Sequence, residues 1–276
     1  MENLELTQEW DKVFPKSNKV DHQKITFHNR YGITLAADMY TPKNAAGKLS
    51  AIAVSGPFGA VKEQSSGLYA QTMAEFGFLT IAFDPSFTGE SGGSPRYVAS
   101  PDINTEDFCA AVDFLSVQEN VDPDRIGIIG RSAGGHLSAL AAMNSDLYES
   151  EEWSGYSSKV QACCDMFGPV DFLKLIEIDE HEIATNPNFR WKSMSETHEG
   201  ALMGGDPATL SERSKEFCPP YILTKEMSPM LILHGDCDKL VPCSISEEFY
   251  DKIVEAGMED RADLYILAGA GHGTKE

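Results

Sequence analysis

Gly130-Arg131-Ser132-Ala133-Gly134 is a GxSxG pentapeptide that stands between two segments of different character. The apolar run 125–129 before it is typical of a buried strand, and 133–144 after it has the pattern of a helix. A serine at such a turn has its hydroxyl exposed at a helix N-terminus, and the glycines let the two chain segments pass closely. Ser132 is therefore predicted to be a nucleophile, in preference to the alternative that the glycines only close a tight turn.

Outward from this turn, short apolar runs alternate with helical patterns in both directions. Strands are predicted over 25–28, 35–40, 51–54, 78–83, 125–129, 160–167, 229–233 and 263–267, and helices over 67–76, 105–117, 133–144 and 244–256. The first two strands form a hairpin, and Glu106 and Asp107 are expected to favour the N-terminus of the helix 105–117. This alternation predicts an α/β fold, with a mostly parallel twisted sheet and helices on both faces.

The rhythm breaks over 172–226, where polarity is mixed and no regular period is visible. This stretch contains two aromatic residues close together, Phe189 and Trp191, and a Gly-Gly-Asp-Pro turn at 204–207. We expect 172–226 to form a small cap inserted into a single α/β domain that spans 1–276.

A serine hydroxyl needs an adjacent base, and in this arrangement the acid and then the histidine follow the serine along the chain. Of the seven histidines, His272 alone follows the last predicted strand, and glycines flank it on both sides. The acid is expected just after the strand 229–233, where Asp238 is the first choice and Asp236 the alternative. Asp236 also fits a purely structural role, in which its carboxylate accepts backbone N–H groups of a turn.

Acyl transfer also needs two N–H donors for the oxyanion. One is predicted to be the backbone N–H of Ala133, and the other that of Phe58, since Pro57 has no N–H. The Phe58 ring is equally consistent with the wall of an acyl pocket and with the core. His234 is expected to brace the acid loop and His136 to pack on the helix after the serine. A surface position is favoured for His198 over a contact with substrate.

The charge balance limits the partners, because 43 acidic against 22 basic side chains give a net charge of −21. Nucleic acids and anionic membrane surfaces are unsuitable partners for such a chain. No apolar run approaches the ~20 residues of a membrane span, and 1–17 lacks the apolar core of a signal peptide. Six cysteines without a disulfide pattern fit a reducing cytoplasm, although a redox role at Cys237 and Cys243 is an alternative. The absence of metal-ligand spacing and of GxGxxG predicts no metal and no cofactor.

These segments resemble known families. The segment 130–137 resembles the α/β-hydrolase esterases and lipases, and 231–242 with 269–273 resembles small-ester carboxylesterases and acetyl or feruloyl esterases. In contrast, 56–64 and 84–93 are similar to dienelactone-hydrolase-like bacterial proteins. The resemblance implies the α/β-hydrolase fold and a catalytic triad of Ser132, Asp238 and His272.

Two departures accompany this resemblance. The sequence lacks the HGGG segment that many esterases carry after the third strand. It also ends four residues after His272, where these families usually add a closing helix, so a truncated or unusually short C-terminus is expected.

The sequence thus predicts a serine hydrolase that cleaves small carboxylic esters through an acyl-enzyme, with short acyl groups favoured because the cap is small. A lactone or dienelactone hydrolase, a serine peptidase or acyltransferase, and a non-catalytic ligand-binding module on the same fold remain alternatives. The sequence leaves open whether the chain forms a homo-oligomer.

Overall fold

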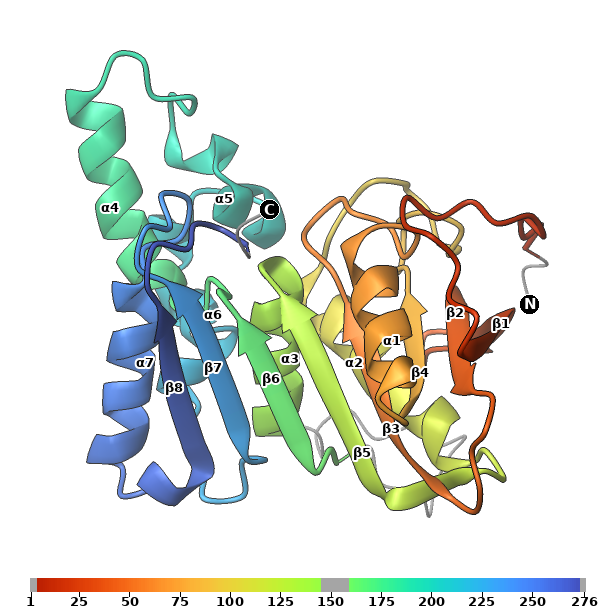
Figure 1. Ribbon diagram of the computed structural model, residues 1–276. Coiled ribbons are helices and arrows are strands. Elements are labelled where there is room, and N and C mark those ends of the chain that lie inside the picture. The colour runs from red at the N-terminus through yellow and green to blue at the C-terminus, as the bar shows by residue number, and fades with distance from the viewer. Residues whose placement is uncertain (1–3, 145–158, 274–276) are drawn as a thin grey trace.

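The computed structural model describes residues 4–144 and 159–273. An eight-stranded sheet runs through them in the order β1-β2-β4-β3-β5-β6-β7-β8 (Figure 1). The strands are β1 (Val20–His28), β2 (Thr34–Pro42), β3 (Leu49–Ser55), β4 (Leu79–Phe83), β5 (Val121–Arg131), β6 (Ala162–Met166), β7 (Met230–Gly235) and β8 (Ala262–Leu267). The pairs β1·β2 and β2·β4 are antiparallel and all other neighbours are parallel, which confirms the predicted hairpin and the mostly parallel sheet.

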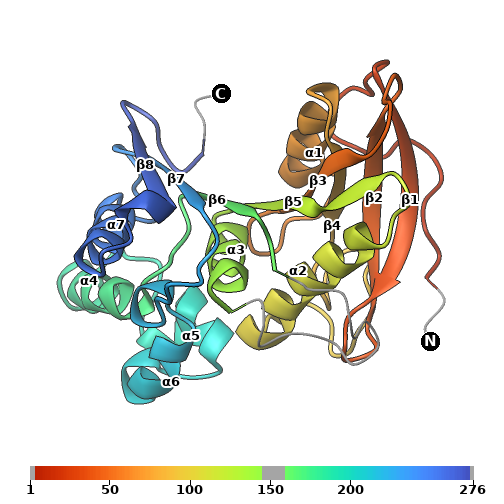
Figure 2. The ribbon, with the colours of Figure 1, turned by 90° about the horizontal axis from the view of Figure 1, so that it is seen from below.

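Helices lie on both faces of this sheet, as predicted (Figure 2). The α-helices are α1 (Ser65–Glu75), α2 (Pro101–Ser116), α3 (Ala133–Asn144), α4 (Phe172–Thr185), α5 (His198–Met203), α6 (Ser211–Glu216) and α7 (Ser244–Glu255). Short 3-10 helices are η3 (Met194–Glu196), η4 (Pro207–Leu210), η5 (Pro219–Tyr221) and η6 (Glu259–Arg261). Figure 2 shows α1 on one face and α2, α3 and α7 on the other.

The alternation of side chains along β3 explains why both faces need cover. Ile52 and Val54 pack with Ala70 of α1, whereas Ala51 and Ala53 belong to the cluster on the opposite face. Successive residues of a strand point to opposite sides, so a strand that is apolar at every position requires helices above and below it.

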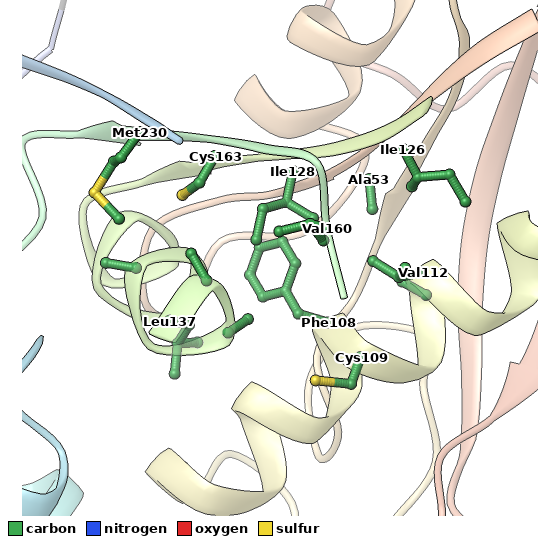
Figure 3. Close-up of a cluster of buried hydrophobic side chains, with 14 of the residues drawn as sticks. Ala53, Phe108, Cys109, Val112, Ile126, Ile128, Leu137, Val160, Cys163 and Met230 are labelled. Carbon is green, nitrogen blue, oxygen red and sulfur yellow. The ribbon is translucent and has the colours of Figure 1, made fainter. Parts of the chain in front are cut away.

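The larger core lies between the sheet and the helices α2 and α3 (Figure 3). The Phe108 ring of α2 is fully buried there, next to Ile128 of β5 and Val160. Truncating an aromatic side chain in such a position costs about 3–5 kcal/mol, because a cavity remains. The half of β5 that leads to Ser132 is therefore supported by close packing at Ile126 and Ile128, whereas 123–125 are exposed.

The prediction for the N-terminus of α2 is wrong, because this helix begins at Pro101, four residues before the expected start. Proline suits the first helical position, since the N–H that it lacks has no intrahelical acceptor. Glu106 and Asp107 are buried in the middle of the helix instead of capping it. Their carboxylates accept the backbone N–H groups of Arg30 and Ser86, at 2.9 and 2.7 Å, so they tie α2 to neighbouring loops.

The stretch 172–226, for which an inserted cap is predicted, contains α4, α5, α6 and three of the 3-10 helices. Asp171 caps α4 by accepting the N–H of Lys174 at 3.1 Å. Phe172, Met203 and Phe217 of this stretch form a cluster with Leu140 of α3. In Figure 1, α4 and α5 rise above the carboxyl ends of the parallel strands. The division into one domain and an inserted cap stays a prediction.

Candidate active site

Ser132 lies at a sharp turn between β5 and α3, with a positive φ of 55°. A non-glycine residue in this region is strained by about 1–3 kcal/mol, so the surroundings must hold it. The Ser132 N–H donates to Met166 O at 2.9 Å, and Gly134 N–H donates to Gly56 O at 3.1 Å. A Cβ atom at Gly130 would overlap the carbonyl oxygen of Gly134, which explains the glycines of the pentapeptide.

His272 brings the three predicted residues together at the carboxyl ends of the parallel strands. Its Nε2 lies 2.9 Å from Oγ of Ser132, and its Nδ1 lies 2.7 Å from Oδ2 of Asp238. The three side chains come from the turns that follow β5, β7 and β8. Because parallel strands end at the same edge of a sheet, residues 34 and 140 positions apart meet there.

The Asp238 carboxylate is buried and held from several sides. Its Oδ1 accepts the N–H groups of Leu240 at 2.8 Å and Val241 at 3.0 Å. Burial alone would raise the pKa of Asp238, but hydrogen bonds from His234, His272 and these two N–H groups hold that pKa below its ordinary value. Asp238 is therefore ionised and able to orient an imidazole at neutral pH.

Asp236, the alternative acid, has a different position. Its Oδ1 accepts the N–H of Gly269 at 2.6 Å, and the side chain is exposed. Among the described residues no hydrogen bond joins Asp236 to His272. The carboxylate fixes the turn before His272, which is the structural role that the sequence offered as its alternative.

The proposed oxyanion donors lie beside Ser132. Ala133 is the first residue of α3, where backbone N–H groups have no intrahelical acceptor. Within 4–144 and 159–273, no hydrogen bond occupies the N–H of Ala133 or that of Phe58. Phe58 is 53% exposed and lines a cavity, which excludes the alternative that its ring belongs to the hydrophobic core.

Two cavities meet at Phe58 and Ala133. The larger, of about 520 Å³, contains Ser132 and His272 and extends under α4 and α5. The smaller, of about 70 Å³, shares Phe58 and Ala133 with the larger one, but neither Ser132 nor His272 lines it. Its apolar side chains include Leu137 of α3, Phe172 of α4 and Leu202 of α5, together with residues of the neighbouring loops.

Polar and aromatic side chains line part of the larger cavity. Arg190 lies over the ring of Trp191, with its Cζ 4.1 Å from the ring centroid. Asp179 and Glu199 also line this cavity, and burial raises the pKa of both carboxyls. His198 packs against Trp191 and Phe58. Its side chain is exposed, as expected, and it also lines the larger cavity.

The other histidines that the sequence singled out are structural. His136 is buried, donates from Nε2 to Phe217 O at 2.6 Å, and packs on the Phe172 ring. Burial lowers the pKa of His136 to about 4, so this imidazole is neutral. His234 is also buried and braces the acid loop, with Nε2 2.9 Å from Val241 O.

Of the residues that line the smaller cavity, sequence reasoning identified Phe58 and Ala133 but missed Leu202 and Phe172. It also missed Arg131, the variable residue of the pentapeptide, whose Cζ lies 5.6 Å from the Tyr69 ring and 5.3 Å from the Phe167 ring. The Arg131 contacts join segments that are distant in the sequence, and the stretch 172–226 has no period that would identify an inward-facing side. The segment that carries Phe58 was the sequence feature that pointed to a pocket beside Ser132.

Two further observations concern the part of the chain that the structure describes. No group of three or more His, Cys, Asp or Glu side chains there is arranged to hold a metal ion. None of the helices in that part combines the length and the apolar character needed to cross a bilayer.

Known proteins resemble this chain in structure and in sequence. The crystal structure of the hypothetical protein PA2218 from Pseudomonas aeruginosa superimposes with a TM-score of 0.70 at 39% identity, covering 99% of this chain and 93% of that one. A truncated carbohydrate esterase from gut microbiota superimposes with a TM-score of 0.72 at 25% identity, covering 94% and 92% of the two chains. The fold is thus the α/β-hydrolase fold, and esterases are among its structural neighbours.

Sequence comparison with curated proteins gives shorter matches. PA2218 is 70% identical over 139 residues, which are 50% of this chain and 38% of that protein. The uncharacterized protein YcjY of Escherichia coli is 44% identical over 126 residues, 44% of this chain and 41% of its own length. The matches therefore span about two fifths of the length of these relatives. Residues 37–253 match the BD-FAE family, and the chain belongs to that family.

Proposed function

We propose that this protein is a serine esterase that hydrolyses small carboxylic esters through an acyl-enzyme. The observation that carries the proposal is the position of His272, whose two ring nitrogens lie 2.9 Å from Ser132 Oγ and 2.7 Å from Asp238 Oδ2. An imidazole placed between a hydroxyl and an ionised carboxylate accepts the hydroxyl proton and is stabilised as imidazolium. The carbohydrate esterase among the structural neighbours supports the same reaction class.

In the first half of the reaction, Oγ of Ser132 attacks the ester carbonyl carbon while its proton passes to Nε2 of His272. The carbonyl electrons move onto oxygen, where the N–H groups of Phe58 and Ala133 stabilise the negative charge. The carbon–oxygen bond to the alcohol then breaks, and His272 protonates the departing oxygen. The acyl group stays on Ser132.

In the second half, water attacks the acyl carbon and gives a proton to His272. The tetrahedral intermediate collapses, the bond to Oγ breaks, and the proton returns to Ser132. Asp238 keeps its negative charge throughout and orients the ring. The acid product and the free enzyme result.

The two cavities suggest where the acyl and alcohol portions of an ester bind. The smaller cavity of about 70 Å³ has an apolar lining and suits a short acyl chain. The larger one has room and charged side chains, and we assign it to the alcohol portion. We also propose that the protein works in the cytoplasm, since all six cysteines are free thiols.

The test is hydrolysis of p-nitrophenyl esters with acyl chains of two to roughly eight carbons by the wild type and by Ser132→Ala. Ser138→Ala is the matched control, because Ser138 lies in α3 and donates its hydroxyl to Gly135 O at 2.8 Å. We expect Ser132→Ala to lose turnover, Ser138→Ala to keep it, and short chains to be preferred. Labelling by a fluorophosphonate, read by mass spectrometry, should occur in the wild type and be absent from Ser132→Ala. Equal turnover by wild type and Ser132→Ala would contradict the proposal.

A further inference from the structure

We define the oxyanion loop as 56–61. Lys62, the residue that directly follows this loop, carries a buried ammonium group. Its side chain has 0% exposure, and its Nζ lies 2.6 Å from Glu63, 2.8 Å from Asp84 and 2.7 Å from Glu90. Burial alone would lower the pKa of Lys62, but the three carboxylates raise it above its ordinary value. We call Lys62, Glu63, Asp84 and Glu90 the Lys62 cluster.

The Lys62 cluster joins the end of the oxyanion loop, which follows β3, to the end of β4. Asp84 follows β4, and its Oδ1 also accepts the backbone N–H of Lys62 at 2.7 Å. The other oxygen accepts the N–H of Glu90 at 2.9 Å. Gly89 has a φ of 55°, and a Cβ there would overlap the Asp84 carboxylate, so the turn closes tightly around that group. The backbone of Lys62, as well as its side chain, is thereby fixed.

The oxyanion loop is thus held at both ends. At its start Gly56 O accepts the N–H of Gly134, which ties the loop to the turn that carries Ser132. At its end Lys62 enters the cluster. Between these anchors, Ala60 N–H donates to Pro57 O at 3.0 Å and Val61 N–H donates to Gln64 Oε1 at 3.2 Å. The Phe58 ring between them is 53% exposed and offers little packing to fix its own backbone.

We propose that Lys62, held by Asp84 and Glu90, is a positioning residue that sets the Phe58 N–H for the oxyanion. This inference rests on the proposed esterase function and deepens it. An oxyanion donor contributes only if it is already in place when the charge develops, and a displacement of a fraction of an ångström weakens it. Lys62 touches no reacting atom, so its effect reaches the reaction through the backbone of the loop.

Two segments that the triad does not use, 56–64 and 84–93, have a role in this arrangement. The motif 56–64 supplies both the donor and the ammonium group, and 84–93 supplies the carboxylates and the glycine that let the group be buried. Removing one partner of such a set leaves a buried charge without its counter-ion, so the four side chains of the Lys62 cluster act as a unit.

The experiment compares Lys62→Met with Lys24→Met, a matched control. Lys24 is a second buried ammonium of the same region, with Nζ 2.6 Å from Glu90 and 2.9 Å from Asp11, but it lies on β1 and outside the oxyanion loop. Each variant is assayed for kcat and KM with p-nitrophenyl acetate. A short trifluoromethyl ketone measures the oxyanion site directly, because its adduct with the serine carries an oxyanion. Melting temperature is recorded for each variant.

We expect Lys62→Met to lower kcat by about 10–100-fold with KM within about twofold, because loss of one oxyanion donor costs about 10²–10³-fold and here the donor is displaced, not lost. The affinity for the ketone should fall by a similar factor. Lys24→Met should lower the melting temperature while changing kcat less than about threefold. If Lys62→Met does not fold, Glu90→Gln takes its place, and the same pattern with a smaller amplitude is expected.

Three outcomes would overturn the inference, and a fourth would refute the esterase proposal on which it rests. Equal losses of kcat in Lys62→Met and Lys24→Met would show a general effect of stability. Unchanged ketone affinity in Lys62→Met, or in Glu90→Gln where that variant replaces it, would separate the cluster from the oxyanion. An inactive wild type, or one equalled by Ser132→Ala, would refute the esterase proposal itself, whereas an active wild type matched by Lys62→Met would refute this inference alone.

Discussion

Oδ2 of Asp238 lies 3.2 Å from Nε2 of the buried His234. The same carboxylate oxygen lies 2.7 Å from Nδ1 of His272, so two imidazoles converge on it. His234 is fixed in turn, with its Nδ1 2.7 Å from Ser246 Oγ. Because Nε2 of His234 faces two oxygen acceptors, Asp238 and the carbonyl of Val241, the proton of this ring belongs on Nε2. The carboxylate is thereby held in one orientation, aimed at His272.

The first prediction concerns this carboxylate. Asp238→Asn keeps the size of the side chain and removes the charge that stabilises the His272 imidazolium. We expect kcat for p-nitrophenyl acetate to fall by about 10³–10⁴-fold, with KM little changed, as for a triad whose acid is replaced by its amide. Steady-state kinetics at pH 7.5 measures both constants.

Asp236→Asn is the control for the same loop. Asp236 fixes the turn at Gly269 and makes no hydrogen bond to His272 within the described residues. We expect its replacement to reduce kcat by less than about fivefold, since one exposed hydrogen bond contributes about 0.5–1.5 kcal/mol. A larger loss in Asp236→Asn than in Asp238→Asn would reverse the assignment of the acid.

A second prediction concerns the length of the acyl chain. Leu202 of α5 lines the smaller cavity together with Leu137 and Phe172. Leu202→Ala enlarges this cavity, so longer chains should fit. We expect the ratio of kcat/KM for hexanoate over acetate to rise about tenfold, because one methylene in an apolar pocket is worth about 1–3 kcal/mol. Parallel assays with p-nitrophenyl esters give the ratio.

Leu210→Ala controls for a loss of packing near the same cluster. Leu210 packs, like Leu202, against the cluster that contains Phe172, but it does not line the smaller cavity. The hexanoate-to-acetate ratio should therefore stay within about twofold of the wild type. A similar rise of the ratio in both variants would mean that loosened packing, and not the cavity wall, sets the chain length.

Most of the sheet was predictable because its signals are local. The strand predicted at 51–54 is the centre of β3 (Leu49–Ser55), and the helix predicted at 133–144 is α3. The start of α2 was missed although Pro101 carries a local signal for a first helical position. The acidic pair at 106–107 favours a later start, but its hydrogen-bond partners Arg30 and Ser86 lie 76 and 21 residues away in the sequence.

The stretch 172–226 resisted prediction for a physical reason. In α4 the buried residues are Phe172, Leu175 and Ile176 of its first turns. Ile178 packs partly against the core, and none of the residues 177–185 is fully buried. A helix that is buried along only part of its length shows no sustained period of 3.6 residues. The lining of both cavities therefore could not be read from the sequence.

The candidate site divides in the same way. Chain order and glycine spacing predict Ser132 and His272 and an acid after the strand 229–233, with Asp238 preferred to Asp236. The structure brings Ser132, Asp238 and His272 within hydrogen-bond distance. Their catalytic role stays a prediction. The environment of Lys62 was not predictable, since it depends on carboxylates 22 and 28 residues further along the chain.

The third prediction concerns stability and pH. Asp165 ends up fully buried in β6, with Oδ1 accepting the N–H of Gly168 at 3.0 Å and Oδ2 without a partner among the described residues. Burial raises the pKa of Asp165 to about 7, against which the nearby His234 and the Gly168 N–H act. In the unfolded chain an aspartate has a pKa of about 3.9.

Between these two pKa values the folded protein keeps a proton on Asp165 that the unfolded chain has lost. The unfolding free energy therefore falls as pH rises from about 4 to about 7, and the contribution is constant above that range. Asp165→Asn removes this term, so its unfolding free energy should exceed that of the wild type by about 1–4 kcal/mol at pH 8 and approach it near pH 4. Urea denaturation at several pH values measures the difference. Asp263→Asn, the control, removes a charge from an exposed position on β8. It should shift the plot of unfolding free energy against pH without changing the slope of that plot. Parallel curves for wild type and Asp165→Asn would mean that Asp165 is ionised in the folded protein at neutral pH.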